Sequence, residues 1–318
     1  MVWRYPQRMG RQIHNFTQLW TTHRLVLAPY KRANGGFHDD FHYHSARAGA
    51  EGRVRLLHLG VNHVESLISN CTSSYEAMPN LLVGPALPWP FLAMSRISLE
   101  SAARICYALD PSQDPEQRLM RLSALIAWSE HEASKALASA RRLPDGALRD
   151  EQERLRQRAG AVDYYASSAG LLLDRTPRYP VIRDPKGHRP PESSNLALVD
   201  VVEEQFPTVG SEAYRRWSGY VHGAPWILQS TVSTISGQEW VPNITRLQVV
   251  DTFLLVTVAV TNAMKLSASY SGIPFGKIDA RSKSLIDLTM SETYRLRRPL
   301  RRRLLSRAAQ DEAEAEYN

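Results

Sequence analysis

The apolar run that decides the fold occupies residues 252–264 and reads Thr-Phe-Leu-Leu-Val-Thr-Val-Ala-Val-Thr-Asn-Ala-Met. Asp251 and Lys265 close it, so it is shorter than the roughly 20 residues that a helix needs to cross a bilayer. A helix that is apolar nearly all round is normally buried by other helices. The run therefore predicts the central core helix of a bundle, over about 244–269, and no membrane association.

Other helices are predicted where apolar residues recur at spacings of three and four. The first shows this pattern most clearly, with Val54, Leu57, Val61, Val64 and Leu67. Asp110-Pro111 ends one helix because the residue before a proline disfavours helical geometry, and Asp114-Pro115 opens the next. Together these signals predict helices over residues 46–70, 91–109, 114–142, 147–170, 195–206, 209–222, 281–292 and 297–314.

Strand signals are few, which favours an all-α fold class. Residues 232–235 and 240–241 alternate enough to predict one short hairpin, and no repeat of fixed period is present. We therefore expect a helical bundle over residues 46–294, with a Pro-rich internal loop at 174–194. An irregular segment at 1–45 precedes it, and a basic and then acidic tail at 295–318 follows it.

The composition points to a mildly basic protein of a reducing compartment. The formal net charge is +7, and 33 of the 39 basic residues are Arg. This bias favours a nucleic-acid or acidic partner, although GC-rich coding produces the same bias. Two cysteines without a CxxC motif and an N-terminus without an apolar signal core predict a cytoplasmic location.

The most informative stretch, residues 214–223, reads Tyr-Arg-Arg-Trp-Ser-Gly-Tyr-Val-His-Gly. On a helix Arg215, Ser218 and His222 cluster on one side. A histidine can exchange a proton near neutral pH, and an arginine can hold a phosphate, a combination suited to phosphodiester cleavage. The alternative is that His222 packs beside an aromatic stripe and has no chemical role.

This stretch resembles the Arg–(x)4–6–His signature of HEPN-type helical proteins. Residues 95–104, Ser-Arg-Ile-Ser-Leu-Glu-Ser-Ala-Ala-Arg, also resemble a segment of uncharacterised HEPN-like bacterial proteins, in which an Arg–(x)3–Glu helix precedes the late helix with its histidine. The resemblance implies an all-α HEPN-like bundle and an active site shared by two protomers. Many HEPN proteins are metal-independent ribonucleases of defence or stress-response systems, and others are non-catalytic binding modules.

The resemblance also implies the roles of individual residues. His222 would be the acid and base, and Arg215 or Arg216 would contact the phosphate. Trp217 occupies the arginine position of the shortest spacing, so both arginines stay candidates. Ser218 matches the serine of the late Ser–(x)3–His helix in those HEPN-like proteins and is a further candidate site residue.

Arg96, Glu100 and Arg104 follow one another at four-residue steps and form an ion ladder along one helix face. We expect a solvated ladder, since such pairs usually lie on an exposed face. The alternative is a row that lines a cleft facing His222 and supports it.

Two further polar clusters complete the candidates. The stretch at 37–44 contains His38, Asp39, Asp40, His42 and His44, which could bind a divalent metal, but we expect a polar surface loop and no metal or cofactor. The basic run around Pro299 could contact nucleic acid or could form a solvated terminal helix neutralised by the acidic residues after it. Its candidate nucleic-acid contacts are Arg297, Arg298, Arg301, Arg302 and Arg303.

Three functions are consistent with the sequence. The first is a metal-independent endoribonuclease that works as a homodimer on RNA. The second is a non-catalytic HEPN-like module that binds nucleic acid or a protein partner. The third is a structural or regulatory helical protein with a packed His222.

Overall fold

The computed structural model describes residues 5–24, 35–82, 88–139, 145–175, 180–190, 232–235, 239–242, 245–274 and 276–316. Within these ranges eight helices hold more than half of the 318 residues, and four short strands form two separate hairpins. The fold is therefore all-α, as the sequence predicts.

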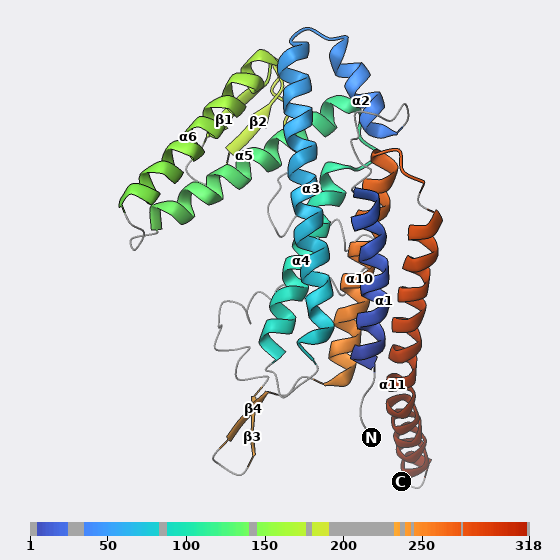
Figure 1. The fold of residues 1–318 in the computed structure, drawn as a ribbon. Coiled ribbons are helices and arrows are strands. Elements are labelled where there is room, and N and C mark those ends of the chain that lie inside the picture. The colour runs from blue at the N-terminus through green and yellow to red at the C-terminus, as the bar shows by residue number, and fades with distance from the viewer. Residues whose placement is uncertain are drawn as a thin grey trace.

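Helix α10 (Arg246–Tyr270) lies at the centre of the bundle (Figure 1). It begins at a reciprocal cap, in which the Thr245 hydroxyl accepts from the Gln248 N–H and the Gln248 side chain accepts from the Thr245 N–H. Val250, Phe253 and Val256 are fully buried. Among the described helices, only α10 is long and apolar enough to cross a membrane, and 72% of its most apolar window is buried inside the bundle. Its prediction as the core helix is confirmed.

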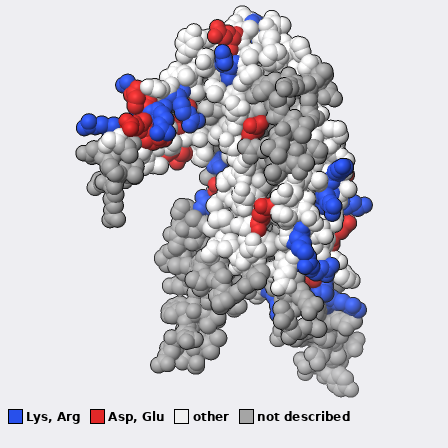
Figure 2. Space-filling view, in the orientation of Figure 1, with Lys and Arg blue, Asp and Glu red and all other residues white. Residues whose placement is uncertain are grey.

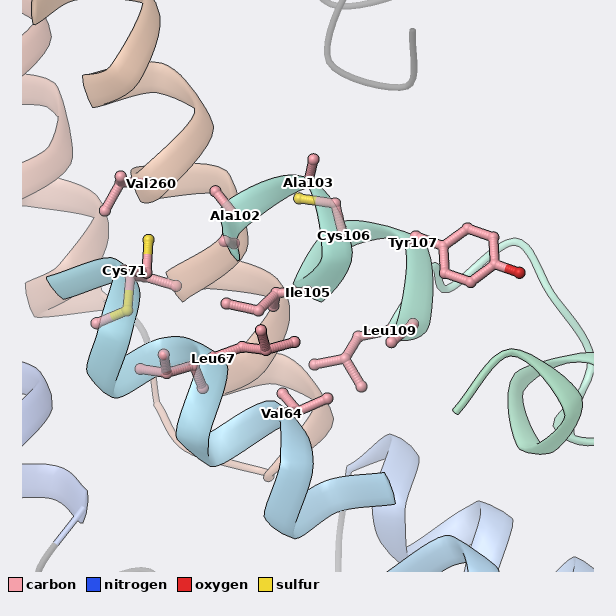
Figure 3. Close-up of a cluster of buried hydrophobic side chains, with 14 of the residues drawn as sticks. Val64, Leu67, Cys71, Ala102, Ala103, Ile105, Cys106, Tyr107, Leu109 and Val260 are labelled. Atoms are coloured by element: carbon pink, nitrogen blue, oxygen red, sulfur yellow. The ribbon is translucent and has the colours of Figure 1, made fainter. Parts of the chain in front are cut away.

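Helix α3 (Ala50–Asn80) packs against most of the other described helices, and mainly against α4 (Pro88–Ala108). The two helices run antiparallel: the Cys71 thiol contacts the Ser98 carbonyl at 3.4 Å, and the Asn70 amide donates to the Ser101 hydroxyl at 3.2 Å. Apolar side chains of α3, α4 and α10 meet between these helices (Figure 3).

The N-terminal residues are helical, so the prediction of an irregular segment at 1–45 is wrong. Helix α1 (Tyr5–Arg24) packs between α3 and α11 (Gly276–Glu316), and a short helix α2 (Gly36–Ser45) lies at the other end of the bundle (Figure 1). Among the buried residues of α1, four large apolar side chains recur at helical spacing: Tyr5, Met9, Ile13 and Phe16. That apolar stripe accounts for the helix.

Helices α5 (Pro115–Ser139) and α6 (Asp145–Ser168) form an arm that leans away from the lower part of the bundle (Figure 1). Strands β1 (Leu172–Arg175) and β2 (Pro180–Arg183) pair antiparallel beside it, and β2 packs against α5. Part of the predicted Pro-rich loop is therefore a hairpin, which proline permits at the first residue of an edge strand. The predicted hairpin downstream is confirmed as β3 (Val232–Ile235) and β4 (Glu239–Pro242).

The C-terminal residues do not form a separate tail, because α11 continues through Pro299 to Glu316 as a single helix. The sequence predicts two helices here, over 281–292 and 297–314, and the structure joins them into one. Pro299 lies within it, because the fixed φ of proline is compatible with helical geometry at the cost of one hydrogen bond. Before the proline, Leu296 packs against the core and Arg297 contacts Asp251 of α10 at 3.1 Å. These contacts hold the first part of the basic run on the bundle.

Candidate functional site

The row formed by Arg96, Glu100 and Arg104 lies on α4 and is largely buried. The Arg96 Nε–H donates to Glu100 Oε1 at 2.6 Å, and Arg104 Nη1 lies 3.9 Å from Glu100 Oε2. The side chains of Arg96, Glu100 and Arg104 are only 14%, 15% and 10% exposed. The expectation of a solvated ladder is therefore wrong. The alternative, a row that lines a cleft facing His222, stays a prediction because His222 lies outside the described residues.

An aromatic ring from another helix orients the last member of this row. The guanidinium carbon of Arg104 lies 4.4 Å from the centre of the Trp128 ring, which belongs to α5. A guanidinium prefers this position because its positive charge is attracted by the negative face of the ring.

A histidine of α3 lies in the electric field of the same arginine. Because residues 70 and 71 contact residues 101 and 98, the antiparallel register of α3 and α4 places His63 opposite residues 106–108, about one turn beyond Arg104. Burial, and after it the charges of Arg104 and Arg158, lower the pKa of His63 to about 4. His63 is therefore a neutral imidazole at physiological pH.

The surroundings of His63 result from the close packing of α3, α5 and α6. Gly60 precedes His63 by three residues, and a Cβ at Gly60 would lie 2.6 Å from the Leu122 Cβ of α5. The absence of a side chain at Gly60 lets α3 approach α5 closely. Arg158 comes from α6, which packs on both α3 and α5.

We call the six side chains assembled in this way the Arg104 cluster. They come from four helices and are His63, Arg96, Glu100, Arg104, Trp128 and Arg158. The sequence identifies only the three members on α4, which share a helix face. The other three lie far apart in the chain, and only the packing of α3, α5 and α6 brings Trp128 and His63 toward Arg104 and Arg158 toward His63.

An acidic centre borders the Arg104 cluster on α5. Glu130 is 4% exposed and lies 3.5 Å from Arg175, which also contacts Asp163 at 2.9 Å. Burial raises the pKa of Glu130, while Arg175 and then Arg158 oppose that rise. Because Arg175 comes from β1, this centre fastens the hairpin to the α5–α6 arm.

The His-rich stretch is a helix, so its prediction as a surface loop is wrong. Asp40 is completely buried and accepts from Arg118 Nε at 2.9 Å and from the Tyr270 hydroxyl at 2.8 Å. His44 is also buried, and its Nε2 lies 3.1 Å from the Pro115 carbonyl oxygen. Both residues join α2 to its neighbours. The rings of His38 and His42 lie 4.2 Å apart on the outer side.

The part of the chain that the structure describes contains no group of three or more His, Cys, Asp or Glu side chains able to share a metal ion. Both cysteines are buried thiols there, and burial raises the pKa of Cys106 to about 12. Neither cysteine is therefore a nucleophile at neutral pH.

The remaining predicted site residues are distributed as follows. His222, Arg215, Arg216 and Ser218 lie outside the described residues. Arg297 and Arg298 are exposed on α11, and Lys and Arg side chains gather on that side of the molecule (Figure 2). For three further candidate contacts the structure describes the helical backbone of α11 but not the side chains: Arg301, Arg302 and Arg303.

The chain matches no protein-family model, no curated protein sequence and no solved structure. The residues and their geometry therefore carry the functional argument alone.

Proposed function

We propose that this chain is an HEPN-like protein that acts on RNA and cleaves it as a homodimer without a metal ion. The observation that carries the proposal is the largely buried row on α4, in which Arg96 and Arg104 both lie against Glu100. Guanidinium groups held in a fixed geometry suit recognition of a phosphate. The formal net charge of +7 favours the same partner.

In the proposed reaction His222 removes the proton from a ribose 2′-hydroxyl. The 2′-oxygen attacks the adjacent phosphorus, and the bond to the 5′-oxygen of the next nucleotide breaks. That oxygen takes a proton, which His222 returns, so the products are a 2′,3′-cyclic phosphate and a 5′-hydroxyl. Arg215 or Arg216 stabilises the charge on the non-bridging oxygens.

A dimer is part of the proposal because the helix predicted over residues 209–222 would separate these groups. Residues 215 and 222 would be about 10 Å apart along its axis, at 1.5 Å per residue. Side chains on a helix lean toward its N-terminus, so Arg215 would lean away from His222. Two antiparallel copies crossing near Gly219 would bring the arginine of one protomer to the histidine of its partner.

The test is RNA cleavage in the presence of a chelator. Wild type should cleave, whereas His222→Ala and the double variant Arg215→Ala/Arg216→Ala should not. Mixing the two inactive variants should restore about a quarter of the activity, since half of the dimers are mixed and each has one intact site. His188→Ala, a change at an exposed histidine that pairs with Asp184, is the matched control and should cleave normally.

A second candidate is a non-catalytic module that binds RNA, because the Arg104 cluster can hold phosphates without any reaction. RNA binding without cleavage by wild type would favour this candidate. A His222→Ala protein that fails to fold, with no RNA binding by wild type, would favour a packed histidine and contradict both proposals.

A further inference from the structure

We propose that His38 and His42 of α2 form a two-histidine site for a divalent transition metal ion of the class of Cu²⁺, Ni²⁺ and Zn²⁺. The site is separate from the proposed RNA reaction, which uses no metal ion. Because the described residues hold no group of three His, Cys, Asp or Glu side chains that could share an ion, water would complete the coordination.

The helical conformation of α2 brings the two imidazoles together. Residues four apart on a helix lie on one face, with their Cβ atoms about 5–6 Å apart. The centres of the His38 and His42 rings lie 4.2 Å apart, with an angle of 74° between the ring planes. In a loop the same two residues would have no fixed spacing. The helix therefore gives suitable ligands a suitable geometry, as a metal site requires.

The distance between the rings matches that of two imidazoles bound to one ion. An imidazole nitrogen binds Zn²⁺ at about 2.0–2.1 Å and the ring centre lies roughly 1.1 Å farther out, so two ligands at a right angle have ring centres roughly 4.5 Å apart. The observed 4.2 Å therefore requires only a small adjustment of the side chains. Ligands at right angles are typical of square-planar and tetragonal sites, which suit Cu²⁺ and Ni²⁺, and Cu²⁺ binds most tightly in this series.

Both rings are available to an ion from solvent. His42 is exposed and His38 is half-buried. Within the described ranges of the chain neither imidazole has a hydrogen-bond or ion-pair partner, and the ring contacts of the pair are with each other and with Phe41. The third histidine of the helix differs, because His44 is buried and its Nε2 lies 3.1 Å from the Pro115 carbonyl oxygen.

The opposite face of α2 is fixed on the bundle, which holds the histidine pair in place. Phe37, Asp40 and His44 are buried on that face, and Asp40 accepts from the Tyr270 hydroxyl at 2.8 Å. A Cβ at Gly36 would lie 2.6 Å from Cδ2 of Tyr270, so the start of α2 lies directly against α10. The fold thus orders the helix before an ion arrives, and a preorganised site loses less entropy on binding.

Two imidazoles on one ordered helix should bind an ion more tightly than two independent histidines. Once the first nitrogen is bound, the second contact forms within the molecule and benefits from a high effective concentration. Loss of either histidine removes that gain, so affinity should fall at least roughly tenfold. The ion should also raise the melting temperature, because it binds the folded pair in preference to the unfolded chain.

The experiment is a calorimetric titration of the whole protein with Cu²⁺ at neutral pH in a weakly coordinating buffer. His38→Gln and His42→Gln should each weaken the tightest binding event at least roughly tenfold. His188→Gln is the matched control, since it removes one exposed histidine that pairs with Asp184 at 2.8 Å and leaves the α2 pair intact. This control should bind Cu²⁺ as wild type does, and circular dichroism should show that all three variants are folded.

Electron paramagnetic resonance of the bound Cu²⁺ provides a readout that does not depend on a variant. The nitrogen couplings count the coordinating imidazoles, and wild type with one equivalent of Cu²⁺ should show two. In His42→Gln the tightest site should show fewer than two. Equal affinities of wild type, His38→Gln and His42→Gln, or fewer than two imidazoles on the ion in folded wild type, would overturn the proposal.

Discussion

Replacing Arg118 by Met should destabilise the protein more than any other charge-removing change in the described residues. Asp40 is completely buried and accepts from Arg118 Nε at 2.9 Å, from Arg118 Nη2 at 2.5 Å and from the Tyr270 hydroxyl at 2.8 Å. The variant removes both guanidinium contacts and leaves a buried carboxylate with one hydroxyl.

The expected cost follows from these contacts. A hydrogen bond to a charged group contributes about 1.5–3 kcal/mol, so two of them correspond to about 3–6 kcal/mol. Removing one partner of a buried ion pair typically costs about 3–5 kcal/mol, which agrees. Because the three residues belong to α2, α5 and α10, the loss should lower the free energy of global unfolding.

Urea denaturation followed by circular dichroism measures that free energy. Arg154→Met is the matched control, since this arginine is 72% exposed and pairs with Glu151 on the surface of α6. The control should cost less than about 1 kcal/mol. Adding Asp40→Leu to Arg118→Met should recover much of the loss, because no charge is then left unpaired. A cost below about 1 kcal/mol for Arg118→Met would refute this account of the buried centre.

Three further predictions concern other parts of the structure. Leu255→Ala should lower the free energy of unfolding by about 2–5 kcal/mol in urea denaturation, because the side chain is 3% exposed on the core helix. Between pH 6.5 and about 4, His63 is protonated in the unfolded chain but stays neutral in the folded chain. As the pH falls through this range, the free energy of unfolding of wild type should decrease by up to about 3 kcal/mol relative to that of His63→Gln. The decrease is smaller to the extent that solvent screens the partly buried ring. Parallel stability curves for the two proteins in a phosphate-free buffer would contradict this. Removal of residues 299–318 should leave the melting temperature unchanged, because the contacts of Leu296 and Arg297 are retained.

The elements that the sequence predicts well are those with a strong local signal. The core helix α10 follows from its unbroken apolar run, and α4 and α5 follow from the Asp-Pro pairs between them. Helix α1 was missed because its apolar residues alternate with Arg, Gln and His, and no capping residue marks its start. Packing against α3 and α11 stabilises this helix.

The residues of the candidate site likewise fall into those that the sequence groups together and those that only the packing of helices brings together. Arg96, Glu100 and Arg104 share a helix face, so spacing alone groups them. Their burial was not predictable, since an ion row on a helix is usually solvated and only the packing of α3 and α5 covers this one. No local sequence pattern links His63 or Arg158 to Arg104, because their positions relative to Arg104 depend on how four helices pack.

The central claim is that this chain acts on RNA through the ribose 2′-hydroxyl, and analysis of the cleavage products tests it most directly. Wild type in the presence of a chelator should convert RNA to fragments that end in a 2′,3′-cyclic phosphate and begin with a 5′-hydroxyl. A single 2′-deoxy sugar at the cleaved position should block the reaction, because the attacking group is then missing. Intact RNA, or cleavage that proceeds equally well at the 2′-deoxy position, would contradict the account.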